Sequence, residues 1–210
     1  MHNLLVEIGN TALKATWSDG MTLGKIFRYQ GETSFDFILS LTEGERADVM
    51  VLSSVSEIPL KWKSTLSGRC GELVIMDPHC TAVNSSHQLP AWISPDRAAS
   101  IIASRFLFKG KAVTVFDFGT TLSIDRTDSE GRYVSGSISP GCRTRFKSIF
   151  RYSKSLPLLD TPEEIPSEGT SLNSSIEFGI LSGIMFEIQG HLDANRGKIA
   201  VFNGGDENFF

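Results

Sequence analysis

The apolar residues of this chain fall into two patterns that alternate along its length. Short aliphatic and β-branched runs are typical of buried strands, and apolar residues that recur every three or four positions are typical of amphipathic helices. The predicted strands are residues 4–8, 13–17, 25–29, 49–52, 73–76, 112–116, 122–126, 133–138 and 199–202. The predicted helices are residues 34–41, 60–66, 95–106, 144–152 and 173–192. This mixture of strands and helices predicts an α/β fold.

Polar segments and turn residues separate these elements. Residues 81–95 are polar and contain Pro90 and Pro95, which predicts a loop of the kind that can cover a site. Glycine-containing segments predict a linker at 109–111 and turns at 128–131 and 203–206.

One segment pattern occurs twice. LLVEIGNTALKATWSDG near the start and VTVFDFGTTLSIDRTDSEG in the middle each run from an apolar strand through an acidic residue, a glycine and small polar residues into a second strand. Such a duplication predicts two related α/β halves with a ligand cleft between them. We expect the halves to be residues 1–110 and 111–210.

The first copy carries polar groups that suit a nucleotide. Glu7 can hold a hydrated cation, while Gly9, Asn10, Thr11 and Lys14 can face phosphates. This arrangement predicts a phosphate-binding hairpin.

The second copy places Asp117, Gly119 and Thr120 at the corresponding positions. Either copy alone is explained as well by a hairpin with a polar turn. Two matched acidic hairpins favour a nucleotide site, because turn chemistry alone does not require the pair.

These hairpins resemble those of the actin-like and sugar-kinase ATPase superfamily, and the chain is most similar there to the type III pantothenate kinases. The resemblance is carried by EIGNTALK at 7–14, DR at 96–97, DFGTTLSID at 117–125, SGSISPG at 135–141, LPLL at 156–159 and NGGDE at 203–207. It implies two ribonuclease-H-like halves, each with a mixed sheet flanked by helices. It also implies phosphorylation of pantothenate by ATP to 4′-phosphopantothenate, the first step of coenzyme A biosynthesis.

The resemblance implies roles for individual residues. Asp96 corresponds to the general base, and Arg97 to a pantothenate ligand, with Ser94 and Pro95 in the loop under the substrate. Asp117 corresponds to the ligand of a monovalent cation, potassium or ammonium, which acts beside ATP and Mg²⁺.

Further features of the family follow from the same resemblance. Thr120 corresponds to an ATP contact. Relatives work as homodimers, with the substrate pocket near the subunit interface. The charge and the apolar pattern of this chain predict that it binds neither nucleic acid nor membrane. Relatives also continue past the last residue of this sequence into a further helix, so part of the nucleotide-binding surface is expected to lie outside it.

The chemistry of the Asp96-Arg97 pair is compatible with those roles. Asp96 lies in the first turn of a predicted helix, where the helix dipole favours a carboxylate that can accept a hydrogen bond from an alcohol. The guanidinium of Arg97 matches a carboxylate, which pantothenate carries. The plainer alternative is a helix-capping aspartate beside a surface arginine.

Glycines in two later motifs leave alternatives open. Backbone amides near Gly136, Pro140 and Gly141 can contact a phosphate, or these residues only shape a loop. Gly204 and Gly205 resemble the adenine-side loop of the superfamily, although a plain turn has the same sequence.

Four residues depart from the family pattern. Glu7 stands in place of Asp, Ser94 in place of Gly, His87 in place of Tyr, and Leu172 in place of a Thr that contacts pantothenate. Because phosphoryl transfer depends on alignment, such changes can lower the rate.

The departures keep other functions open. One is a divergent nucleotide-binding relative with weak or no kinase activity, acting as a regulatory or accessory protein. A second is a kinase for another small alcohol. A third is a metal hydrolase that uses Asp96, Asp117 and Asp125.

Composition excludes further classes of protein. Twenty basic and twenty-four acidic residues among 210 give a formal net charge of -4, which provides no general field for nucleic acid. The three cysteines lack metal-site spacing and predict reduced thiols. Without an apolar stretch of transmembrane length, the sequence predicts a cytoplasmic protein.

Overall fold

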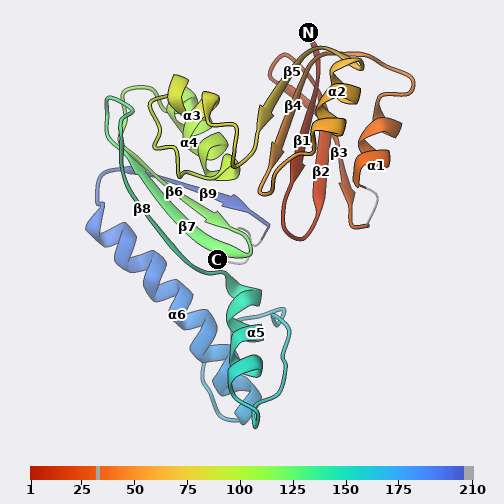
Figure 1. The fold of residues 1–210 in the computed structure, drawn as a ribbon. Coiled ribbons are helices and arrows are strands. Elements are labelled where there is room, and N and C mark those ends of the chain that lie inside the picture. Colours follow the sequence, from red (N-terminus) through yellow and green to blue (C-terminus); the bar gives the residue numbers. More distant parts are fainter. Residues whose placement is uncertain (32–33, 206–210) are drawn as a thin grey trace. The chain divides into compact units, whose positions relative to one another are not determined.

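The computed structural model describes residues 1–31 and 34–205, which form parts of two compact units (Figure 1). The first unit is Met1–Ala99 and the second is Ser100–Phe210. The division falls inside helix α4 (Pro95–Leu107), whereas the boundary expected at residue 110 lies after this helix. The last residue of the predicted turn at 203–206 and the last two of the NGGDE segment lie outside the described residues.

The first unit contains a five-stranded mixed sheet with the order β3-β2-β1-β4-β5. Its strands are β1 (His2–Ile8), β2 (Leu13–Asp19), β3 (Thr22–Tyr29), β4 (Ala47–Ser54) and β5 (Cys70–Met76). Strand β1 pairs antiparallel with β2 and parallel with β4. The acidic end of β1 is therefore held between two neighbours inside the sheet.

Two helices pack against this sheet, α1 (Ser34–Leu41) and α2 (Leu60–Ser67) (Figure 1). Leu4, Met50 and Leu52 lie on one face of the sheet and are fully buried with Ile38 of α1 and Leu66 of α2. Full burial of aliphatic side chains of this size contributes about 1.5–3 kcal/mol each. The core of the unit therefore holds the strand that carries Glu7.

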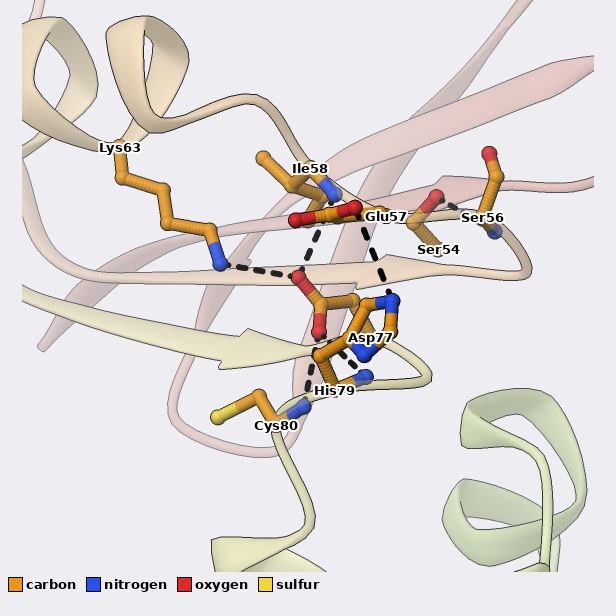
Figure 2. Close-up of polar contacts among 8 residues, drawn as sticks. All are labelled: Ser54, Ser56, Glu57, Ile58, Lys63, Asp77, His79 and Cys80. Atoms are coloured by element: carbon orange, nitrogen blue, oxygen red, sulfur yellow. Dashed lines mark hydrogen bonds and ion pairs between the residues drawn. The ribbon is translucent and has the colours of Figure 1, made fainter.

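A buried carboxylate fixes the chain where β5 ends (Figure 2). The Oδ2 atom of Asp77 accepts hydrogen bonds from Lys63 Nζ at 3.0 Å and Ile58 N at 3.3 Å. Its Oδ1 atom accepts from His79 N at 3.0 Å and Cys80 N at 2.8 Å. Burial alone would raise the pKa of Asp77, but the lysine and the three backbone donors together hold that pKa below its ordinary value.

The second unit contains a four-stranded mixed sheet with the order β8-β7-β6-β9. Its strands are β6 (Val113–Phe118), β7 (Thr121–Thr127), β8 (Tyr133–Pro140) and β9 (Ile199–Gly204). Strand β6 pairs antiparallel with β7 and parallel with β9, as β1 pairs with β2 and β4. The two copies of the repeated segment thus occupy the same place in two similar sheets.

Helix α6 (Leu172–Ala194) runs along this sheet, and helix α5 (Cys142–Tyr152) follows the end of β8 and lies beside α6 (Figure 1). Phe116 and Ile124 are neighbours across β6 and β7 and pack with Phe146 of α5 and Leu181 of α6. This core supports β6 from the side opposite to Asp117, since alternate residues of a strand face opposite ways.

The structure confirms the predicted α/β class, with mixed sheets flanked by helices. It corrects the loop predicted at 81–95, because this segment contains the short helix α3 (Ala82–Ser86). The buried side chain of Asn84 donates to Pro90 O at 3.2 Å and Ile93 O at 2.9 Å, and these contacts hold α3 on the following loop. Within the described residues, no helix has the length and apolar character needed to cross a bilayer.

Candidate active site

The first hairpin lies at the end of β1 and presents its polar groups in an exposed turn. Gly9 N donates to Ala12 O at 3.1 Å and closes the turn that carries Asn10 and Thr11. Glu7 and Lys14 face each other across β1 and β2, with Oε2 and Nζ 3.4 Å apart. Both side chains are 45% exposed, so a phosphate and its counterion can reach them.

The second hairpin has the same turn. Gly119 N donates to Thr121 O at 3.0 Å, and Gly119 and Thr120 are exposed. The carbonyl of Thr120 accepts hydrogen bonds from Gly141 N at 3.0 Å and from Thr144 Oγ1 at 2.6 Å. The start of α5 therefore supports the backbone of this hairpin.

Only glycine fits at position 141, because the backbone there lies very close to Gly119. A Cβ atom added at Gly141 would lie 2.1 Å from Gly119 O. Because the Gly141 N–H donates to Thr120, the structure favours the loop-shaping role of this glycine over direct contact with a phosphate.

Asp117 lies one residue before the end of β6 and is half-buried. The parallel register places Asn203 of β9 opposite Asp117. Asn203 Nδ2 lies 3.4 Å from Asp117 Oδ2 and 3.0 Å from the hydroxyl of Ser100 in α4. The turn predicted to begin at Asn203 is wrong there, because Asn203 belongs to β9, and the NGGDE motif gave no sign of this contact.

The start of α4 contains the Asp96-Arg97 pair. Asp96 is in the first turn of the helix, and its Oδ1 atom is buried and accepts no hydrogen bond from the part of the chain that the structure describes. Arg97 is only 4% exposed, and its guanidinium carbon lies 5.4 Å from the centre of the Trp92 ring. Arg97 is therefore not the surface arginine of the plainer alternative.

Ser94 and Pro95 set the geometry of that helix start. Ser94 O accepts from Ala98 N at 2.9 Å, which forms the first helical turn over Pro95. Pro95 is buried at the first position of the helix, where the missing N–H has no cost. The two residues position the backbone that carries Asp96.

Two of the departures lie at helix ends. His87 follows the last residue of α3. Leu172 is the first residue of α6 and is 56% exposed. The neighbouring hydroxyls of Ser171 and Ser174 cap the helix, with Ser174 N donating to Ser171 Oγ at 3.2 Å and Ser171 N to Ser174 Oγ at 2.9 Å.

Asp125 takes no part in a metal cluster within the described residues, where no three His, Cys, Asp or Glu side chains come together. It is 3% exposed and accepts a hydrogen bond from Tyr133 Oη at 3.1 Å. The carboxylate of Asp125 is therefore in contact with β8 of its own sheet.

Known proteins resemble the chain over nearly its whole length. The family model described as type III pantothenate kinase matches residues 3–194. A type III pantothenate kinase from Phocaeicola vulgatus is 33% identical over 99% of this chain and 88% of its own length.

Solved structures share the fold at lower identity. A conserved Baf family protein from Campylobacter jejuni is 19% identical, with a TM-score of 0.58 over 98% of this chain and 85% of its own. The ROK hexokinase from Thermus thermophilus is 13% identical, with a TM-score of 0.51 over 98% and 82%. These similarities confirm the predicted ribonuclease-H-like, actin-like ATPase fold.

Proposed function

The chain belongs to the type III pantothenate kinase family, and from this membership we propose that it transfers the γ-phosphoryl group of ATP to the terminal hydroxyl of pantothenate. The product is 4′-phosphopantothenate, so the reaction is the first step of coenzyme A biosynthesis. The observation that carries the proposal is the pair at the start of α4. There the Oδ1 atom of Asp96 is buried and accepts no hydrogen bond from the described residues, and the next residue, Arg97, is buried as well.

Asp96 is the proposed general base. It accepts the proton of the substrate hydroxyl while that oxygen bonds to the γ-phosphorus and the bond to the β–γ bridging oxygen breaks, which releases ADP. A carboxylate oxygen that accepts no hydrogen bond from the described chain suits this role, because its lone pairs are not taken up by another donor. Arg97 is the proposed ligand of the pantothenate carboxylate, and the Trp92 ring holds the guanidinium in place. Ser94 and Pro95 form the loop beneath the substrate.

Each hairpin carries residues that we propose as contacts of ATP. The amides and hydroxyls of the first turn, Gly9, Asn10 and Thr11, face phosphates together with Lys14, while Glu7 suits a hydrated Mg²⁺. Mg²⁺ bound to ATP supplies neutralisation of the phosphate charge. The family and its fold support binding of ATP and a divalent metal.

Gly119, Thr120 and Asp117 are the proposed residues of the second hairpin toward ATP and a monovalent cation. Potassium and ammonium carry a single charge, and one half-buried carboxylate at the end of β6 suits such an ion. The donor set therefore fits the group that the resemblance implied. We also propose that the enzyme is a cytoplasmic homodimer, in line with its family.

The test is formation of phosphopantothenate from MgATP, pantothenate and a potassium salt. Asp96→Asn should lower kcat by at least about 10²-fold, the usual contribution of a general base, while ATP binding persists. Asp36→Asn is the matched control, because Asp36 also lies in the first turn of a helix, α1, away from the proposed chemistry. It should leave kcat unchanged.

Two results would contradict the proposal. A kcat within tenfold of the parent in Asp96→Asn would remove Asp96 from the role of base. A parent that binds ATP but forms no phosphopantothenate would favour the divergent nucleotide-binding relative, and product from another small alcohol would favour a different acceptor.

A further inference from the structure

A short chain of polar contacts joins helix α4 to the end of strand β6. The carboxamide nitrogen of Asn203 lies 3.0 Å from Ser100 Oγ and 3.4 Å from Asp117 Oδ2. A carboxamide nitrogen carries two hydrogens, so one group can donate to both oxygens. Ser100 and Asp117 belong to elements that are otherwise separate in the sequence, and Asn203 connects them.

The backbone fixes the place of Asn203. Strands β6 and β9 pair in parallel with Asn203 opposite Asp117 and Gly204 opposite Phe118. Gly205 N donates to Phe118 O at 2.8 Å. A Cβ atom at Gly204, whose φ is 112°, would lie 2.3 Å from Phe118 O. The end of β9 is therefore held close against β6, and this strand pairing places the Asn203 side chain beside Asp117.

The other contact reaches the helix of the proposed base. Ser100 lies four residues after Asp96 on α4, so the two residues are one turn apart on the same face of the helix. The link from Asn203 to Ser100 therefore restrains α4 at Ser100.

We propose that Asn203 is a positioning residue that orients the Asp117 carboxylate for its monovalent cation and ties it to α4 through Ser100. The inference rests on the proposed function, which assigns the cation to Asp117 and the base to Asp96. The positioning role predicts that the affinity for the cation depends on Asn203 and Ser100, two residues that carry no charge. A role in folding alone would change stability without changing the response to the cation.

The experiment uses the full chain and four variants. Asn203→Leu keeps the branched shape of the side chain and removes both contacts, Ser100→Ala removes one, and the double variant combines them. Ser104→Ala is the matched control, because Ser104 lies one turn further on α4 and donates only to Ile101 O in its own helix, at 2.8 Å, among the contacts of the described residues.

Two readouts follow the cation. The first is the KCl concentration that gives half of the rise in Tm in the presence of MgADP, with choline chloride keeping the ionic strength constant. The second is the KCl concentration that gives half-maximal phosphopantothenate formation. Both should rise about tenfold in Asn203→Leu and about threefold in Ser100→Ala. The double variant should equal Asn203→Leu, because both changes break one link, and Ser104→Ala should equal the parent.

The outcomes separate the two proposals. Unchanged KCl dependence in a folded Asn203→Leu, or an equal change in Ser104→Ala, would overturn the positioning role and leave the kinase intact. If Asn203→Leu fails to fold, unchanged KCl dependence in Ser100→Ala overturns the role equally. A parent without product whose Tm still responds to KCl, with that response weakened in Asn203→Leu, would support the positioning role and overturn the kinase. A parent with neither response would overturn both.

Discussion

Replacing Asp77 should destabilise the first unit far more than replacing its ion-pair partner, Lys63. Each oxygen of this carboxylate accepts two hydrogen bonds, one pair from Lys63 and Ile58 and the other from His79 and Cys80. Asp77→Asn keeps the shape but turns one oxygen into an NH₂ group that faces two donors. The variant therefore leaves donors unsatisfied at a site where the Asp77 side chain is 0% exposed.

The magnitude follows from those contacts. Breaking a buried charge network by removing one partner costs about 3–5 kcal/mol, and we expect about 3 kcal/mol here because the Lys63 side chain is 28% exposed. For a chain of this size each kcal/mol lowers Tm by about 2–4 °C, so Tm should fall by about 6–12 °C. Lys63→Met should cost about 1 kcal/mol, since Asp77 keeps its three backbone donors.

The assay is tryptophan fluorescence during thermal and urea unfolding. All three tryptophans, Trp17, Trp62 and Trp92, belong to the first unit, so their signal reports on that unit. An Asp77→Asn variant within about 0.5 kcal/mol of the parent, or less destabilised than Lys63→Met, would refute the reasoning.

The pH dependence has a definite sign. The pKa of Asp77 is lower in the folded protein than its ordinary value of about 4. The carboxylate therefore contributes its stability fully above about pH 4 to 5, and the contribution is lost as the pH falls through the folded pKa. The difference between the parent and Asp77→Asn should be constant near neutral pH and shrink only below about pH 4.

Two further predictions concern the support of the second hairpin. Gly141→Ala should raise the KM for ATP at least tenfold, because the new Cβ would lie 2.1 Å from Gly119 O and the hairpin must move. Gly190→Ala is the control, because an added Cβ there meets nothing within 4 Å. Equal initial-rate kinetics for the two variants would contradict the close approach. Thr144→Val removes the 2.6 Å hydrogen bond to Thr120 O and should raise the KM for ATP about threefold at a stability cost of about 1 kcal/mol. Thr144→Ser should restore both values, and a Ser variant as impaired as Val would assign the effect to packing.

Local pattern was enough to predict most elements of the fold. The runs around β1 and β6 are apolar and end in an acidic residue before a glycine, so strand, turn and second strand follow from neighbouring residues alone. The helix α3 was missed because its five residues show no apolar period, and its anchor is the amide of Asn84 on carbonyls further along the chain.

Contacts between residues far apart in the sequence limited how much of the candidate site could be predicted. Sequence motifs predicted roles for Asp96, Arg97 and Asp117, but the burial of Arg97 depends on the fold of the loop that brings Trp92 to it. The contact of Asn203 with Ser100 joins residues that are 103 positions apart. No local pattern encodes such a pairing, because it arises only when β9 takes its place beside β6.

The pairing of β6 with β9 also imposes an order on folding. In the first sheet, residues 9–46 separate β1 from its parallel partner β4, whereas residues 119–198 separate β6 from β9 in the second. Closing the longer loop costs more chain entropy, and such non-local pairings form slowly. Until β9 arrives, β6 has an unpaired edge next to its apolar residues, which is a surface prone to aggregation. During synthesis, the edge of β6 that carries Asp117 therefore stays unpaired until residues 199–204 have been made.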